Sequence, residues 1–161
     1  MANLRDSIVR KKYQKNSPLD NWDIQFNKKG FIHNKKCFGA DNELLFYYDY
    51  NYKHKMKLQE HKMYDANDYL LEHTKYIYDD IGLLSAESIY KGDHSLLVRY
   101  IYEYSPKRRL IKTNIHAPYP SIYTTSYYSF VYNRQGKLAV QTTFDADEKV
   151  YQIDSFWYDN N

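Results

Sequence analysis

The side chains that could perform metal chemistry are scattered along this chain of 161 residues. Six histidines occur without forming a tight cluster: His33, His54, His61, His73, His94 and His116. His54 and His61 would lie on opposite faces of a strand, because side chains alternate and the separation is odd. Cys37 is the single cysteine, so a thiolate zinc site lacks a second sulfur ligand. The sequence therefore predicts no metal and no cofactor.

Catalysis by a nucleophile or by paired acids finds equally little support. Cys37 lies in no recognisable nucleophile signature, and unpaired cysteines are usually small buried side chains. The carboxylate pairs Asp79-Asp80 and Asp145/Asp147 stand in predicted turns, where bonds to the local backbone explain them more simply than acid–base work. Phosphate-loop and nucleophile-elbow patterns do not occur in the sequence. We expect a protein that is not an enzyme and assign no catalytic residues.

The densest basic cluster lies in the stretch SPKRRLIK, which contains Lys107, Arg108, Arg109 and Lys112. These cations could clamp phosphates, and neighbouring tyrosines could stack on a single-stranded nucleic acid. A solvated hairpin tip explains the cluster more simply, because the net charge of the chain is only +3.

Tyrosine is in excess, with 20 copies, which is more than one small core would hold. Exposed tyrosine supplies contact area at protein interfaces at low entropic cost. Pro118 and Pro120 oppose regular strand pairing in the segment 116–130, which favours a long loop there. We therefore expect a partner-binding surface made of that loop and a neighbouring acidic turn. Its predicted residues are Tyr119, Tyr123, Tyr127, Tyr128, Asp145, Asp147 and Glu148.

A repeated pattern must position these residues: aromatic–x–aromatic–(Asp, Asn or Glu), then a turn, then an apolar strand. It occurs as YIYDDIGLL, YIYEYSPKRRLI and FVYNRQGKLAV, with degenerate copies upstream and a truncated FWYDNN. The predicted turn-opening residues are Asn27, Asp49, Asp79, Glu103, Asn133 and Asp159. Asp and Asn can accept bonds from backbone groups two residues on, and glycine supplies positive φ.

The spacing of about 25 residues fits two strands and two turns, so each strand should pair with its sequence neighbours. We expect a single, mainly all-β domain, 1–161, built as an antiparallel β-meander of repeated hairpins over 22–161. The sheet should be strongly curved or part-closed. Leu4, Ile8 and Val9 have helical spacing, which predicts a short amphipathic N-terminal helix over 1–16. The segment 63–71 fits either a helical turn or a loop.

Targeting signals are not visible: the N-terminus has no apolar run of signal-peptide type, and no stretch is long and apolar enough for a membrane span. Together with the lone cysteine, this favours a soluble cytoplasmic protein without a membrane partner. The edges of an unclosed meander could pair between chains, which leaves a homodimer open.

The three best copies of the pattern resemble the tyrosine–aspartate (YD) repeats of RHS proteins, whose core is Tyr-x-Tyr-Asp-x-x-Gly-x-Leu. The match is good over residues 76–161 and poor over 22–58, and Tyr104, Ser105 and Pro106 break the third copy. The resemblance implies a scaffold without catalysis and, by context, an immunity protein that neutralises a cognate polymorphic toxin. The alternative is a ligand-binding repeat protein that stacks a glycan or single-stranded nucleic acid on exposed tyrosines and Trp157.

Overall fold

The computed structural model describes residues 8–10, 21–53, 57–118 and 125–158, and all the regular structure in these ranges is β-strand. The strands divide into two compact units: Met1–Lys75 with Tyr90–Ser95, and Tyr76–Ile89 with Leu96–Asn161. Their bounds are β1 (Ile8–Arg10), β2 (Asn21–Phe26), β3 (Ile32–Phe38), β4 (Leu44–Tyr52), β5 (Leu58–Asp65), β6 (Leu70–Tyr78), β7 (Leu84–Lys91), β8 (Leu96–Tyr104), β9 (Leu110–His116), β10 (Thr125–Tyr132), β11 (Leu138–Asp145) and β12 (Val150–Ser155).

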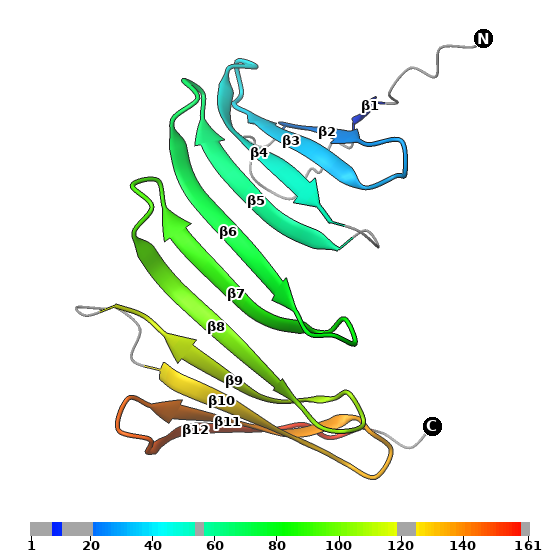
Figure 1. The fold of residues 1–161 in the computed structure, drawn as a ribbon, viewed down its shortest axis with the longest axis vertical. Coiled ribbons are helices and arrows are strands. Elements are labelled where there is room, and N and C mark those ends of the chain that lie inside the picture. The colour runs from blue at the N-terminus through cyan, green and yellow to red at the C-terminus, as the bar shows by residue number, and fades with distance from the viewer. Residues whose placement is uncertain (1–7, 11–20, 54–56, 119–124, 159–161) are drawn as a thin grey trace. The chain divides into compact units, whose positions relative to one another are not determined.

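Each unit is an antiparallel meander in which strands pair with their neighbours in sequence (Figure 1). This confirms the predicted all-β architecture of consecutive hairpins. Among the described residues, neither unit closes on itself by pairing a late strand with an early one, so the expected part-closure is not seen within a unit. No helix in the described ranges is long and apolar enough to cross a membrane.

The predicted N-terminal helix is wrong over Ile8–Arg10, which form strand β1. This strand pairs with β2 through the register Ile8↔Gln25. Adjacent β-branched Ile8 and Val9 favour a strand, and a short isolated helix is only marginally stable in water. The remainder of the expected helix, 1–7 and 11–16, lies outside the described residues.

The hairpins share one turn geometry, illustrated by the turn at 79–83. The Asp79 N–H donates to the Leu83 carbonyl at 2.9 Å, and the Gly82 N–H donates to the Asp79 carbonyl at 2.9 Å. This is a three-residue loop whose last residue adopts positive φ, the left-handed region that glycine enters freely. The positive-φ residues are Gly30, Asn42, Asp68, Gly82, His94, Arg108, Gly136 and Glu148.

An aromatic residue before each turn pairs with an aliphatic residue after it, and such cross-strand pairs stabilise a hairpin. The pairs are Phe26↔Ile32, Phe38↔Leu44, Tyr52↔Leu58, Tyr64↔Leu70, Tyr104↔Leu110, Tyr132↔Leu138 and Phe144↔Val150. A register shift follows each pair and leaves one extra residue on the second strand, which is a β-bulge. Leu45, Leu71, Ile111 and Tyr151 occupy these bulges and are 40%, 45%, 38% and 74% exposed.

This geometry confirms three predicted turn-opening residues and corrects two. Asn27, Asp79 and Asn133 open turns. Asp49 instead lies inside β4 opposite Asn34, and Glu103 lies inside β8, because the turn after it opens at Ser105. Asp159 lies outside the described residues.

Turns also occur at the opposite ends of the hairpins; the acidic turn at Asp145 was predicted, whereas those at Gly39 and Lys91 were not. They open at Gly39, Asp65, Lys91 and Asp145. The turn at Asp65 settles the ambiguous segment 63–71, which is the end of β5, a turn and the start of β6.

The core of the described residues is small. Its buried hydrophobic side chains are Cys37, Ala86 and Val98, accompanied by buried threonines at 74, 113 and 143. Intermediate burial of many tyrosines supplies the remaining contact area, since the ring can pack while the hydroxyl meets a polar partner.

Candidate functional site

The best candidate site is the surface formed by strand β12, the residues after it and the turn that precedes it, all in the second unit. We call this the C-terminal surface. Six of its large hydrophobic residues are exposed: Val150 (55%), Tyr151 (74%), Ile153 (61%), Phe156 (40%), Trp157 (92%) and Tyr158 (42%). Large exposed apolar areas are typical of interaction sites on soluble proteins.

Strand pairing fixes the position of Val150 at the start of β12. β12 pairs with β11, and Val150 takes the aliphatic position opposite Phe144. In the hairpin of β8 and β9, Leu110 takes the equivalent position. Its backbone carbonyl accepts a hydrogen bond from the Tyr132 hydroxyl of the next strand, β10. The sequence pattern could identify Val150 as a strand start, but it could not indicate that this position is exposed.

Tyr127 continues the C-terminal surface on β10. Its ring stacks on Phe144 with a centroid distance of 4.2 Å and an interplanar angle of 16°. The Lys112 ammonium lies 4.1 Å from the centroid of the Tyr127 ring. Because Tyr127 pairs with Phe144, and Phe144 pairs with Val150, one row of side chains crosses three strands.

The turn at 145–149 forms the acidic margin of the surface. The Asp145 carboxylate accepts the backbone N–H groups of Asp147 and Lys149, both at 2.9 Å, so it holds the turn. Asp147 and Lys149 are solvent-exposed and lie 3.8 Å apart, a geometry that contributes little stability. Glu148 takes positive φ and is exposed. The carboxylates of Asp147, which faces Lys149, and of Glu148 are therefore both exposed to solvent.

The predicted partner-binding residues are only partly brought together. Tyr127 and the acidic turn lie at the same end of the β10–β11 pair, since Thr125 pairs with Asp145. Tyr128 points to the opposite face from Tyr127 and pairs with Thr113 and Thr143. Tyr119 and Tyr123 lie outside the described residues. The expected loop over 116–130 is wrong at both ends, because β9 includes His116 and β10 begins at Thr125.

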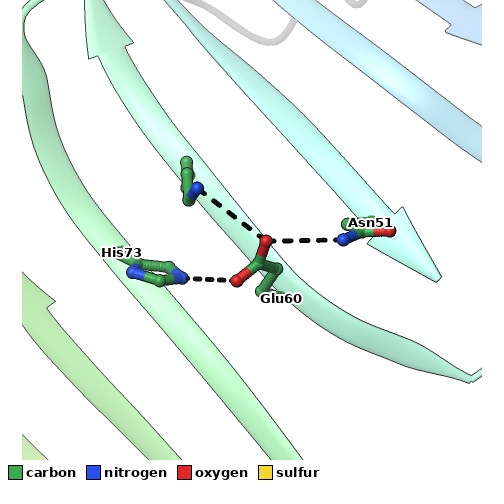
Figure 2. Close-up of polar contacts among 4 residues, drawn as sticks. Asn51, Glu60 and His73 are labelled. Atoms are coloured by element: carbon green, nitrogen blue, oxygen red, sulfur yellow. Dashed lines mark hydrogen bonds and ion pairs between the residues drawn. The ribbon is translucent and has the colours of Figure 1, made fainter. Parts of the chain in front are cut away.

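A polar cluster in the first unit is the second candidate (Figure 2). The Glu60 carboxylate accepts His73 Nε2–H at 2.9 Å and Asn51 Nδ2–H at 3.4 Å, and Lys62 Nζ lies 3.8 Å away. Burial alone would raise the pKa of Glu60, but these donors outweigh it and hold the pKa below its ordinary value. Glu60 is therefore an ionised carboxylate with a hydrogen-bond donor at each oxygen.

A cavity of about 480 Å³ lies beside this cluster in the first unit. Its lining includes Asp49, Asn51, Glu60, Lys62 and Tyr64. The mixture of two carboxylates, an amide, an ammonium and a phenol can both donate and accept hydrogen bonds. Volumes of this size are typical of small-ligand sites.

Two reactive residues of the first unit, Cys37 and His61, are buried or part-buried. Cys37 is 1% exposed on β3, which closes its thiol to substrates. His61 stacks on Tyr50 at 5.6 Å, and burial, with a smaller contribution from His73, lowers the pKa of His61. Within the described ranges, no group of three or more His, Cys, Asp or Glu side chains could hold a metal ion.

These features define a class of protein: repeated aromatic hairpins that present an apolar surface with an acidic turn at its margin.

No protein-family model and no curated protein matches the chain. Among solved structures it is similar to parts of three toxin-complex chains. The TcdB2-TccC3-TEV crystal structure is 13% identical with a TM-score of 0.47, and the match covers 82% of this chain and 8% of that chain. The TcdB2-TccC3-Cdc42 crystal structure is 15% identical with a TM-score of 0.43, and the match covers 77% of this chain and 7% of that chain. The Photorhabdus luminescens Tc holotoxin pore is 10% identical with a TM-score of 0.27, and the match covers 88% of this chain and 12% of that chain. The chain thus spans a small fraction of each, and at these scores the likeness supports no inference about function.

Proposed function

We propose that the chain is a protein-binding module, specifically a cytosolic immunity protein that binds and neutralises a cognate bacterial toxin without performing a reaction. The observation that supports this most directly is the C-terminal surface. Six exposed apolar side chains between Val150 and Tyr158 lie in the same hairpin as the acidic turn. An apolar centre with a charged rim is the usual anatomy of a protein interface.

The charge of the rim suggests the character of the partner. Asp147 and Glu148 would attract a basic surface and raise the association rate, while Trp157 and Ile153 would supply the desolvated contacts. A stable complex needs about 1,600 Å² of buried surface in total, so the partner should also cover Tyr127 and neighbouring side chains of β10. The repeats resemble YD repeats in sequence, and this resemblance supports the proposal of a toxin-associated role.

Co-expression with the product of the adjacent reading frame tests the proposal. The two proteins should co-purify, and the chain should restore growth of cells that express the partner. Trp157→Ala should weaken the complex by about 30-fold, as expected for an interface hot spot. Tyr69→Ala is the matched control, because Tyr69 is 72% exposed and lies in the first unit. Absence of both a complex and growth rescue would refute the proposed function.

The cavity beside Glu60 favours a second candidate, a ligand-binding repeat protein that takes a glycan. Sugar hydroxyls both donate and accept hydrogen bonds, which the carboxylates and the amide of this cavity can complement. A glycan array followed by titration of the best sugar would test it. Asn51→Ala should abolish a genuine response, and a flat array would remove the candidate.

A further inference from the structure

A second cavity, of about 450 Å³, lies in the second unit where the turn at 105–109 meets strands β9 and β10. Its walls are largely apolar and include Pro106, Ile111, Phe130 and Val131. Ile111 is open because it is the bulge residue of its hairpin, and Val131 is 57% exposed. The hairpin geometry therefore leaves an apolar recess next to the basic cluster of the sequence.

Cationic side chains lie along one side of the recess. Lys107 and Arg109 line it, and the Arg109 guanidinium lies 5.6 Å from the centroid of the Tyr132 ring. Arg109 also lies directly beside Gly136, where a Cβ would collide with the guanidinium. Gly136 belongs to the turn joining β10 to β11, which adds the exposed cations Arg134 and Lys137 at the same end of the strands.

These positive charges are not neutralised locally. In the described part of the chain, the ion pairs involve Lys62, His73 and Lys149, and none involves a cation of the two basic turns. A carboxylate that approached Lys107 and Arg109 would find two unpaired partners beside a low-dielectric recess, where charge attraction is stronger than in bulk water.

The walls favour a protein segment over a nucleic acid. Bases bind by stacking on open aromatic faces. Here the Tyr132 ring is covered by Arg109, and its hydroxyl donates to the Leu110 carbonyl at 2.8 Å. The remaining walls are mainly aliphatic, which suits an apolar side chain, and the recess is large enough for one or two such groups.

We propose that this recess docks an acidic segment of a partner protein, which inserts an apolar side chain and places its carboxylates on Lys107 and Arg109. The proposal goes beyond the toxin interaction, since the recess lies at the end of the strands opposite the acidic turn at 145–149. The C-terminal surface meets that end at Tyr158, whose ring centroid lies 4.9 Å from Lys137 Nζ.

Fluorescence anisotropy with the full chain tests the proposal. The probe is a short labelled peptide with a Leu-Phe centre flanked by glutamates, compared with the same peptide flanked by lysines. The acidic peptide should bind at least about tenfold tighter, and the affinity should fall as salt is raised, because the flanking charges are exposed. Equal binding of the two peptides would overturn the proposal.

Two matched pairs of variants locate the site. Val131→Thr should weaken acidic-peptide binding by about threefold or more, whereas Val150→Thr, at a similarly exposed position, should leave it unchanged. Lys107→Glu should have a larger effect than Lys149→Glu, whose side chain is exposed at the opposite end. Equal effects within each pair, or tighter binding of oligothymidylate than of the acidic peptide, would contradict the assignment.

Discussion

At the residue scale, tyrosine hydroxyls join neighbouring strands by hydrogen bonds to backbone carbonyls. Tyr104 donates to the Leu84 carbonyl at 2.9 Å, and Tyr132 donates to the Leu110 carbonyl at 2.8 Å. Each acceptor is the first residue of the strand that precedes the tyrosine's own strand. We expect Tyr132→Phe to lower the free energy of unfolding by about 1 kcal/mol, because a part-buried carbonyl loses its donor.

Urea denaturation measures this loss, and Tyr151→Phe is the control because its side chain is 74% exposed. If both variants unfold at the wild-type midpoint, the hydroxyl contributes nothing to stability.

Glu60 gives a pH prediction at the same scale. Its pKa in the folded state is lowered below the ordinary 4.5: burial acts against this, but the hydrogen bonds from His73 and Asn51 outweigh burial. The ionised carboxylate therefore stabilises the folded state above the unfolded pKa, and this contribution is lost as the pH falls through the folded pKa. Stability of the wild type should decline more steeply below about pH 5 than that of Glu60→Gln.

Chemical denaturation at a series of pH values measures these slopes. Glu43→Gln, which removes an exposed turn carboxylate, is the matched control for the loss of one negative charge. Equal slopes for Glu60→Gln and wild type would show that the cluster in Figure 2 does not couple protonation to folding.

At the scale of elements, comparing alanine variants of two turn glycines distinguishes the effect of backbone strain from that of a side-chain collision. Gly30 and Gly136 have nearly the same φ, 81° and 83°. A Cβ at Gly30 would meet nothing within 4 Å, whereas one at Gly136 would meet the Arg109 guanidinium. Both alanine variants should lose about 1–2 kcal/mol of stability, since the left-handed conformation is disfavoured equally.

Only Gly136→Ala should also weaken binding of the acidic peptide, because it displaces Arg109 from the rim of the recess. Thermal unfolding and peptide anisotropy measure the two effects separately. A much larger stability loss for Gly136→Ala would mean that Arg109 cannot move aside.

The turns show how far sequence reasoning extends for individual elements. Asn27, Asp79 and Asn133 were predictable, because their side-chain oxygens accept backbone N–H groups four residues on, at 3.1, 2.7 and 3.0 Å. Glu103 follows the same aromatic pattern and was therefore predicted to open a turn. Ser105 opens that turn instead, and its hydroxyl accepts the Arg109 N–H at 3.2 Å. The prediction for Asp49 is wrong because its carboxylate binds a side chain of the neighbouring strand instead of a turn backbone: it accepts Asn34 Nδ2–H at 2.6 Å.

At the scale of the whole molecule, composition and the repeat predicted the all-β class but not the exposed C-terminal surface. Tyrosine content and the repeat indicated strands and turns, which are local properties. Exposure of Val150 or Ile153 depends on which strands flank β12, and no local pattern carries that information. A stricter count of the aromatic–turn–aliphatic pattern would have found the turn at Asp65, since Tyr64 precedes it as Tyr132 precedes Asn133.

The dependence of each strand on its neighbours leads to a last prediction, about cooperativity. Val98 in β8 is 0% exposed, so Val98→Ala should cost about 2 kcal/mol through lost burial and a small cavity. In a repeat architecture, stability is largely a sum of nearest-neighbour terms. Hydrogen exchange should therefore accelerate in β8 and β9 of the second unit, while amides of β3 and β4 in the first unit keep their protection. Val131→Ala, at an exposed position, should change neither; equal acceleration in β3, β4, β8 and β9 would instead show that the two units open as one cooperative block.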